Sequence, residues 1–427
     1  MELKKYKLGE ILDVTRGASL SGEFYATEGK YIRLTCGNFD YQNNCFKENK
    51  SKDNIYYVGD FKPEFLMEKG DIITPLTEQA IGLLGSTAII PESSKYIQSQ
   101  DVAKIICKED LLDKDFAFYL ISSALVKQQL SAAAQQTKIR HTSPDKIKDC
   151  TVWIPELSEQ KRIGKLLRSI DSKIELNRQI NQNLEAMAKQ LYDYWFVQFD
   201  FPNEDGKPYK SSGSAMVWNE ELKREIPQGW SNMSIGDYAP CKSGYAFKSK
   251  DFGGKGLPVI KIGNIQENYT LDMTDSQCID LFNKTLFLAK RYDLVIAMTG
   301  ATIGKFAISQ SNYWVNQRVG RFDLGDRPLS RLGFLFNSLK QEYFREQVFQ
   351  IACGCAQPNI SAEQIDSISI LKPNDVILNQ FNKLCEPLLE LQSENYLQIE
   401  ELTKQRDELL PLLMNGQVSV NSDLSHG

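Results

Sequence analysis

Side chains that can hydrogen-bond nucleic acid stand on predicted turns at matching places in the two halves of this 427-residue chain. Arg, Lys, Asn and Gln can read base edges in the major groove or hold phosphates, so these residues are candidates for DNA contacts. Any single one is more often a solvated surface group, and we expect about a third of the set to touch DNA. The candidates in the first half are Arg16, Arg33, Asn38, Thr77, Gln100, Lys138, Arg140 and His141. Those in the second half are Lys242, Tyr245, Lys261, Asn264, Thr299, Thr302, Lys305, Gln317, Arg318, Gln357 and Asn359.

Residues for acid-base catalysis or metal binding are scarce. His141 and His426 are the only histidines, and His141 is equally a DNA-contact candidate and a solvated loop residue. The nine cysteines are scattered, and the single close pair, Cys353 and Cys355, lacks a second pair, so we expect reduced thiols. The sequence contains no Asn-Pro-Pro-aromatic methyltransferase motif and no nuclease set of Asp and Glu-x-Lys. We therefore expect no catalytic residue, no metal site and no cofactor in this chain.

A glycine-flanked turn, Gly300-Ala-Thr-Ile-Gly304-Lys305, resembles a phosphate-binding loop but departs from it. Three residues instead of four separate the glycines, Phe306 follows the lysine, and a strand rather than a helix is predicted next. Nucleotide hydrolysis is therefore not indicated. The first half has a counterpart at Gln79-Ala-Ile-Gly82. A purely structural turn and a close approach of the backbone to DNA phosphate both remain open.

These candidates belong to a duplicated chain, in which a strand-rich stretch followed by a long amphipathic helix occurs twice. The shift from Ser143 to Ser361, 218 positions, also separates Pro155 from Pro373. The same shift continues without a gap through the helices, so the two copies present matching helix faces. Duplicated modules on matched helices are suited to reading two half-sites of a long ligand.

The fold class predicted for each half is α+β, with a curled mixed sheet and short helices. Short β-favouring runs are separated by turn residues, and helices are predicted from Asp115 to Gln129 and from Leu329 to Gln350. The predicted strands are 31–34, 71–74, 86–90 and 102–106 in the first half, and 259–262, 293–296, 305–308 and 318–322 in the second.

The two long helices carry apolar residues at alternating steps of four and three, which is the a/d seam of a coiled coil. Both seams are polar in the middle, at Asn177, Asn181, Gln392 and Asn395. Polar a/d residues cost stability but fix register, so these four are predicted to set the alignment of an antiparallel helix pair. The alternative is an ordinary surface helix packed on its own domain.

These features predict six segments. They are a first domain at 1–156, a long helix at 157–198, a linker at 199–225, a second domain at 226–374, a second long helix at 375–416 and a polar tail at 417–427.

Composition limits the class of protein. No apolar run approaches the roughly 20 residues that span a bilayer, and the start lacks the apolar segment of a signal peptide, so we expect a cytoplasmic protein. The net charge of −5 weighs against a free-standing nucleic-acid binder. It leaves room for a basic cluster on one face, or for a partner subunit that supplies positive surface.

Six stretches occur in a specific order: Pro155–Ile163, Tyr194–Phe201, Ile226–Trp230, Asp293–Ala307, the pair Asn316-Gln317, and Ile360–Ile365. On these residues, and over nearly its whole length, the chain resembles the specificity subunit of type I restriction-modification systems. The first copy departs from the pattern, with Thr74–Gln79 where the second has Ala297–Thr302. That difference is expected if the two domains read different sequences.

The resemblance implies two tandem target recognition domains separated by two long helices that pair as an antiparallel coiled coil. The implied partners are double-stranded DNA, two modification (methyltransferase) subunits docked on the helices, and restriction (translocase-nuclease) subunits, with no membrane. Such a subunit serves host defence by directing adenine methylation or cleavage at a bipartite, asymmetric target. S-adenosylmethionine would belong to the modification subunit, and ATP and magnesium to the restriction subunit. A helix from Ser158 to Trp195 would be about 57 Å long and would set the spacer between half-sites.

Two other interpretations remain. A specificity subunit of a related system, whose methylase and nuclease are fused in one partner chain, would have the same sequence features. A scaffold that holds two modules without binding DNA is the alternative from a different class. The net charge favours the scaffold, whereas the doubled polar turns argue against it.

Overall fold

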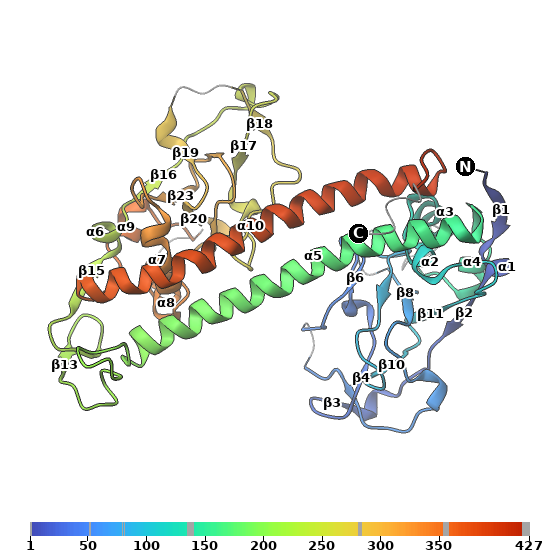
Figure 1. The fold of residues 1–427 in the computed structure, drawn as a ribbon, viewed down its shortest axis with the longest axis horizontal. Helices are drawn as coiled ribbons and strands as arrows, with labels where there is room; N and C mark the ends of the chain where they lie inside the picture. Colours follow the sequence, from blue (N-terminus) through green and yellow to red (C-terminus); the bar gives the residue numbers. More distant parts are fainter. Residues whose placement is uncertain are drawn as a thin grey trace. The chain divides into compact units, whose positions relative to one another are not determined.

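The computed structural model describes residues 2–50, 53–78, 80, 82–134, 141–280, 284–352 and 358–420. Two compact units are present: unit 1 comprises Met1–Ile174 with Glu401–Gly427, and unit 2 comprises Glu175–Glu400. Both divisions fall within the long helices α5 (Leu157–Tyr192) and α10 (Asp375–Met414) (Figure 1). Each unit therefore contains one sheet-rich domain and a stretch of both helices.

Unit 1 contains two four-stranded sheets, in the orders β2-β11-β8-β9 and β10-β4-β7-β3, and the short pairs β1-β12 and β5-β6. Its strands are β1 (Lys4–Lys7), β2 (Leu12–Arg16), β3 (Tyr25–Ala26), β4 (Tyr31–Arg33), β5 (Phe39–Asp40), β6 (Cys45–Phe46), β7 (Tyr56–Tyr57), β8 (Ile72–Pro75), β9 (Ala88–Ile89), β10 (Tyr96–Ile97), β11 (Val102–Cys107) and β12 (Thr151–Ile154). The first sheet is antiparallel throughout, whereas β10 pairs with β4 in parallel. This is the mixed sheet that the sequence predicts.

Unit 2 repeats this plan with sheets β16-β23-β20-β21 and β18-β17-β22-β19 and the pairs β13-β14 and β15-β24. Its strands are β13 (Met216–Asn219), β14 (Arg224–Pro227), β15 (Ser231–Ser234), β16 (Cys241–Ser243), β17 (Leu257–Ile260), β18 (Cys278–Ile279), β19 (Leu288–Ala289), β20 (Leu294–Ala297), β21 (Phe306–Ile308), β22 (Tyr313–Val315), β23 (Val319–Phe322) and β24 (Ser369–Lys372). Here too one pair of the second sheet, β17 with β22, is parallel. The duplication in the sequence is thus a duplication of the first sheet and of the parallel pair in the second sheet, whereas the fourth strand of the second sheet joins a different partner in each unit.

The short helices correct two predictions. Those of unit 1 are α1 (Leu8–Ile11), α2 (Lys114–Ile121), α3 (Ala124–Ala134) and α4 (Pro144–Lys148), and those of unit 2 are α6 (Ile235–Tyr238), α7 (Leu329–Leu339), α8 (Glu342–Ala352) and α9 (Ala362–Asp366). The single helix predicted from Asp115 to Gln129 is two helices, because the Ser122 hydroxyl bonds back to the carbonyl of Phe118 and Ser123 caps α3 at the amide of Val126. The helix predicted from Leu329 to Gln350 likewise breaks, between α7 and α8.

The central strands of each first sheet are covered on both faces. In β8, Ile72 packs in the core with the helices, and its neighbour Ile73 packs against the second sheet. In β20, Leu294 likewise packs in the core with the helices, and its neighbour Val295 packs against the second sheet of unit 2. Successive strand residues point to opposite faces, so burial on both sides explains the unbroken apolar runs in the sequence.

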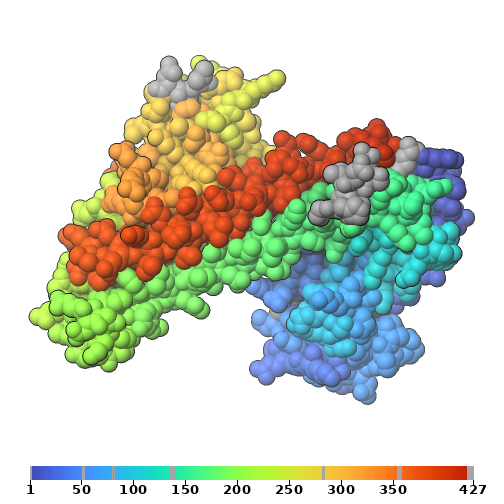
Figure 2. All heavy atoms as spheres, viewed as in Figure 1, coloured from blue at the N-terminus to red at the C-terminus, as the bar shows by residue number. Residues whose placement is uncertain are grey.

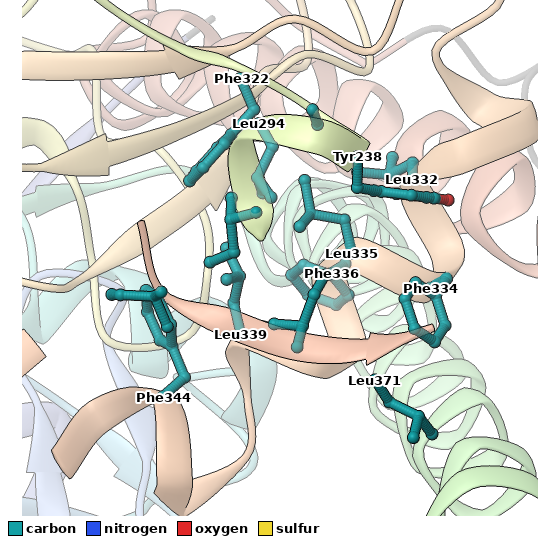
Figure 3. Packing of buried hydrophobic residues seen from close by; sticks show 14 of the residues in the cluster. Tyr238, Leu294, Phe322, Leu332, Phe334, Leu335, Phe336, Leu339, Phe344 and Leu371 are labelled. Carbon is teal, nitrogen blue, oxygen red and sulfur yellow. The ribbon is translucent and has the colours of Figure 1, made fainter. Parts of the chain in front are cut away.

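The helical core of unit 2 joins α7 to the sheet and to both long helices. Leu294 and Phe322 from the sheet lie near Leu332 and Leu335 of α7 (Figure 3). A large apolar side chain buried in this way contributes about 1.5–3 kcal/mol. Within the same core, the ring of Phe196 lies 4.8 Å from that of Phe381 in α10 and 5.1 Å from that of Phe334 in α7.

The long helices run antiparallel within each unit. In unit 2, Asn181 of α5 contacts Asn395 of α10, and Tyr192 farther along α5 contacts Phe381, earlier in α10. Figures 1 and 2 show the two helices side by side over this stretch. In unit 1, Asp171 of α5 is hydrogen-bonded to Arg406 of α10. The predicted seam is thereby confirmed within each unit, and α5 and α10 contain 36 and 40 residues.

The segment 199–225, expected to be a linker, lies inside unit 2. Phe199 and Phe201 are buried, and their rings lie 5.9 and 4.7 Å from that of Trp230. The hairpin of β13 and β14 ends the segment. These contacts make it a packed part of unit 2, because its aromatic residues belong to the core. In the described ranges, no helix is both long and apolar enough to cross a membrane.

Candidate nucleic-acid interface

Four candidates of unit 1 come together at one end of the first sheet. Arg16 ends β2 and donates from Nε to the carbonyl of Gln100, at 2.8 Å, just before β11. Thr77 follows β8, and its hydroxyl lies 3.3 Å from a carboxylate oxygen of Asp101 and 3.2 Å from Nδ1 of His141. We call Arg16, Thr77, Gln100, Asp101 and His141 the unit 1 cluster.

A tight turn before β11 positions this cluster. The amide of Val102 donates to the carbonyl of Ser99, at 3.1 Å, and the amide of Leu76 donates to the carbonyl of Asp101, at 2.8 Å. Gly17 allows the end of β2 to pass beside the turn, because a Cβ atom there would lie 2.2 Å from the carbonyl oxygen of Gln98. The close approach requires glycine.

Unit 2 brings the equivalent segments together. Tyr245 pairs with Asn316, and its carbonyl accepts from the amide of Gln317 at 2.9 Å. Met298 donates its amide to the carbonyl of Arg318, and Thr299 pairs with Asn359 as Thr77 pairs with His141. A Cβ atom on Gly244 would lie 2.2 Å from the carbonyl oxygen of Val315, which repeats the Gly17 contact. The unit 2 cluster comprises Tyr245, Thr299, Gln317, Arg318 and Asn359.

The glycine-flanked turn lies beside the unit 2 cluster. Gly300 and Gly304 have φ values of +75° and +79°, and the turn leads into β21, the strand that the sequence predicts. It therefore lacks the helix N-terminus of a phosphate-binding loop. Among the described residues, the buried hydroxyls of Thr299 and Thr302 have no hydrogen-bond partner. Gln79 and Ile81 of the counterpart in unit 1 lie outside the described residues.

Three candidates are occupied in holding loops. Arg33 is 7% exposed, donates to the carbonyl of Asn54 at 3.2 Å, and lies 3.9 Å from the ring centroid of Tyr25. Asn38 is 1% exposed, and its carbonyl oxygen accepts from the amide of Thr35 at 2.9 Å. Asn264 caps the equivalent turn of unit 2 at the amide of Lys261, at 2.7 Å. These bonds give all three side chains a structural role.

The three lysine candidates of unit 2 each have a protein partner. Lys242 forms an ion pair with Asp323, and the hydrogen bond from Lys242 is the main reason that the pKa of Asp323 is lowered. Lys261 donates to the side-chain oxygen of Gln277 at 2.8 Å, and Lys305 lies 3.2 Å from a carboxylate oxygen of Glu267. None of these three lysines is therefore a free cation.

Three further candidates, Lys138, Arg140 and Gln357, lie outside the described residues. So do Cys353, Cys355 and His426.

Three of the four predicted register residues contact one another in the helix pair, and the fourth, Asn177, contacts Gln398. Asn395 donates from Nδ2 to Oδ1 of Asn181 at 2.9 Å, and Asn181 donates from Nδ2 to the carbonyl of Gln392 at 3.2 Å. Asn177 donates to the side-chain oxygen of Gln398 at 3.1 Å. Asn181 and Asn395 are buried, so their hydrogen bond lies in the seam itself.

Burial raises the pKa of several cysteine thiols. The pKa of Cys107 and of Cys150 is raised to about 11, and that of Cys385 to about 12. At neutral pH these thiols are protonated and are poor nucleophiles. In the part of the chain that the structure describes, no group of three or more His, Cys, Asp or Glu side chains is placed to hold a metal ion.

The sequence-based list omits one cluster residue, Asp101. A signal was available, because Ser99-Gln100-Asp101-Val102 aligns with Asn316-Gln317-Arg318-Val319, and both Gln317 and Arg318 are on the list. An alignment of the turns of the two copies therefore identifies Asp101, whereas a search for basic and amide residues does not.

Comparisons with known proteins agree with this architecture. A family model described as "Type I restriction modification DNA specificity domain" matches residues 1–186 and 227–401. The HindI specificity subunit of Haemophilus influenzae is 24% identical over 470 residues, covering 97% of this chain and 99% of that protein. The MjaIX specificity subunit of Methanocaldococcus jannaschii is 23% identical over 326 residues, covering 75% of this chain and 73% of that protein.

A solved structure has a similar fold. It is the S subunit of the type I restriction-modification system from M. genitalium, with a TM-score of 0.62 at 16% identity, covering 97% of this chain and 96% of that one. Its similarity supports a fold of two tandem sheet-rich domains with long helices. With the family model matching both halves, this chain belongs to the family of type I restriction-modification DNA specificity domains.

Proposed function

We propose that this chain is the DNA-recognition subunit of a type I restriction-modification complex and reads a bipartite, asymmetric target, with one half-site for each unit. One observation carries the proposal. The two units build the same frame, in which the pair Thr77 and His141 corresponds to Thr299 and Asn359, yet they place different side chains on it. A constant frame with different polar groups suits two unlike half-sites.

The chemistry of each cluster fits base reading. The guanidinium of Arg16 uses Nε for the Gln100 carbonyl, and its two terminal nitrogens have no partner among the described residues. Gln100 and Gln317 are exposed amides that can both donate and accept. Arg33, Asn38 and Asn264 are excluded from this proposal because their side chains are used within the protein.

The catalytic steps belong to partner subunits in this proposal. Two modification subunits dock on the long helices and methylate adenine, and restriction subunits join them for cleavage. S-adenosylmethionine, ATP and magnesium are bound by those partners. The net charge of −5 supports a division of labour in which partners supply much of the phosphate contact. The complex acts in the cytoplasm, and the length of the two long helices sets the spacer.

The test is single-molecule mapping of N6-methyladenine in cells that express the cognate modification subunit with this gene intact or deleted. We expect a split, asymmetric motif that is methylated only when the gene is intact. The matched control is a strain in which the deleted gene is restored from a plasmid. Identical methylation in the intact and deleted strains, with the modification subunit expressed in both, would contradict the proposal.

A further inference from the structure

The turn before β11 in unit 1 and the turn before β23 in unit 2 have the same backbone geometry. Val102 donates to the carbonyl of Ser99 at 3.1 Å, and Val319 donates to that of Asn316 at 2.9 Å. In each turn the first side chain accepts from the third amide, Ser99 from Asp101 at 3.4 Å and Asn316 from Arg318 at 3.3 Å. Positions 101 and 318 are therefore equivalent.

The neighbours of this position are equivalent too. The amide of Leu76 donates to the carbonyl of Asp101 at 2.8 Å, and that of Met298 donates to the carbonyl of Arg318 at 3.0 Å. Leu76 and Met298 each precede the threonine of the cluster, Thr77 or Thr299. In both units the amide of this position thus donates to the side chain two residues before it and its carbonyl accepts from a backbone amide, whereas its own side chain differs.

The side chain at this position reverses its charge between the units, whereas the residue before it is glutamine in both. Asp101 accepts from the Thr77 hydroxyl through Oδ1, and it has no ion-pair partner within the described residues. The Arg318 side chain is exposed and makes no hydrogen bond or ion pair with any described residue. Neither charged side chain therefore has an ion-pair partner among the described residues.

Base edges offer complementary partners for these two charges. A carboxylate accepts from the N4 amino group of cytosine, and arginine donates two hydrogen bonds to O6 and N7 of guanine. A carboxylate beside phosphates is repelled, and a hydrogen bond from the amino group of cytosine would offset that cost. Building on the proposed function, we propose that this turn position determines specificity, with Asp101 reading cytosine in one half-site and Arg318 reading guanine in the other.

The alternative is that Asp101 only positions Thr77. The two roles predict different results for charge reversal, because a base reader changes the preferred base and a positioning residue lowers activity at the same base. The variants are Asp101→Ala, Asp101→Asn, Asp101→Arg, Arg318→Ala and Arg318→Asp in the full chain. The matched controls are Asp110→Ala and Arg327→Ala. Both residues are exposed, and they lie after the C-terminal ends of β11 and β23, whereas the turns lie before the N-terminal ends of these strands.

The measurement is the N6-methyladenine motif that each variant produces with the modification subunit, beside the wild-type chain. We expect Asp101→Ala to reduce the preference for cytosine by about tenfold or more at one position of one half-site, the range of a good base contact. Asp101→Arg should change that base to guanine, and Arg318→Asp should change guanine to cytosine in the other half-site. Asp101→Asn, the mildest change, should lower the cytosine preference at the same position. The controls should leave both half-sites unchanged.

The outcomes separate this inference from the proposed function. If the wild-type chain produces no split motif, the proposed function fails and the inference falls with it. If the wild-type motif is present but the Asp101 and Arg318 variants that still methylate keep every base of it, the inference alone is overturned. The unaltered half-site in each variant reports that the chain is folded, and Asp101→Asn keeps the test open where charge reversal prevents methylation.

Discussion

Arg16 and Arg33 have the same guanidinium group in different surroundings. Arg16 is exposed and bonds the protein through Nε alone, whereas Arg33 is 7% exposed, with its guanidinium shared between the Asn54 carbonyl and the Tyr25 ring. Burial leaves Arg33 unable to approach a base without losing these contacts. At the residue scale, the hydrogen-bond partners therefore separate candidate readers from residues that hold loops.

Replacing Arg33 with alanine should lower stability and leave base specificity unchanged. The change removes the hydrogen bond of the guanidinium to the carbonyl of Asn54 and its contact with the Tyr25 ring, and a hydrogen bond from a charged group contributes about 1.5–3 kcal/mol. Urea denaturation of the purified chain measures the loss, and methylation mapping of the same variant measures specificity. Arg16→Ala is the matched control, with the opposite expectation of little change in stability and a relaxed half-site. A relaxed motif for Arg33→Ala at unchanged stability would contradict the structural role.

The sequence predicts which residue types gather at the clusters but not which side chains are free. Asn38 and Gln100 are both amides on turns, and only the folded backbone shows that Asn38 caps the amide of Thr35 while Gln100 is exposed. Residue type alone does not indicate Asp101, because a carboxylate is repelled by DNA phosphates. Tertiary contacts decide these cases, and they bring together residues as distant in sequence as Arg16 and Gln100.

At the element scale, the two long helices are the elements that the sequence predicts best, because their apolar residues recur with helical periodicity. The apolar seam depends on spacing alone, and Ile163, Leu167, Leu184 and Phe381 are buried as expected. The breaks between α2 and α3 and between α7 and α8 were missed because the apolar pattern continues across them. Strands of two residues, such as β5 and β6, were missed because they are too short to show alternation.

The buried pair Asn181 and Asn395 should couple strongly in stability. Asn395→Ala removes the donor to Oδ1 of Asn181, which should cost about 1–3 kcal/mol. Replacing both residues with leucine should cost much less than the sum of the two single changes, because no buried polar group remains, and it should weaken the choice of register. A double-mutant cycle by urea denaturation measures the coupling, with the exposed Asn183→Ala on the same helix as control. Additive losses from the two single changes would show that the pair is not coupled.

At the scale of the whole molecule, duplication explains how one chain can address two unlike sequences. The frame repeats in the strand order of the first sheet, in the parallel pair of the second sheet and in the two isolated bridges beside each cluster. The side chains on the frame are not repeated. A frame kept constant for folding, with variable residues at its turns, allows each unit to change its half-site without loss of the fold.

Thermodynamic coupling between units and half-sites tests this account most directly. One variant carries Arg16→Ala with His141→Ala in unit 1, and the other carries Gln317→Ala with Asn359→Ala in unit 2. Their dissociation constants, in complex with the modification subunit, are measured on the native target and on duplexes with either half-site scrambled.

The unit 1 variant should bind the native target more weakly by about 1–3 kcal/mol per lost base contact. It should lose less than the wild-type chain does when its own half-site is scrambled, and the two losses should add when the other half-site is scrambled. The unit 2 variant should show the mirror pattern. Equal coupling of either variant to both half-sites, or coupling to neither, would contradict the claim that each unit reads its own half-site.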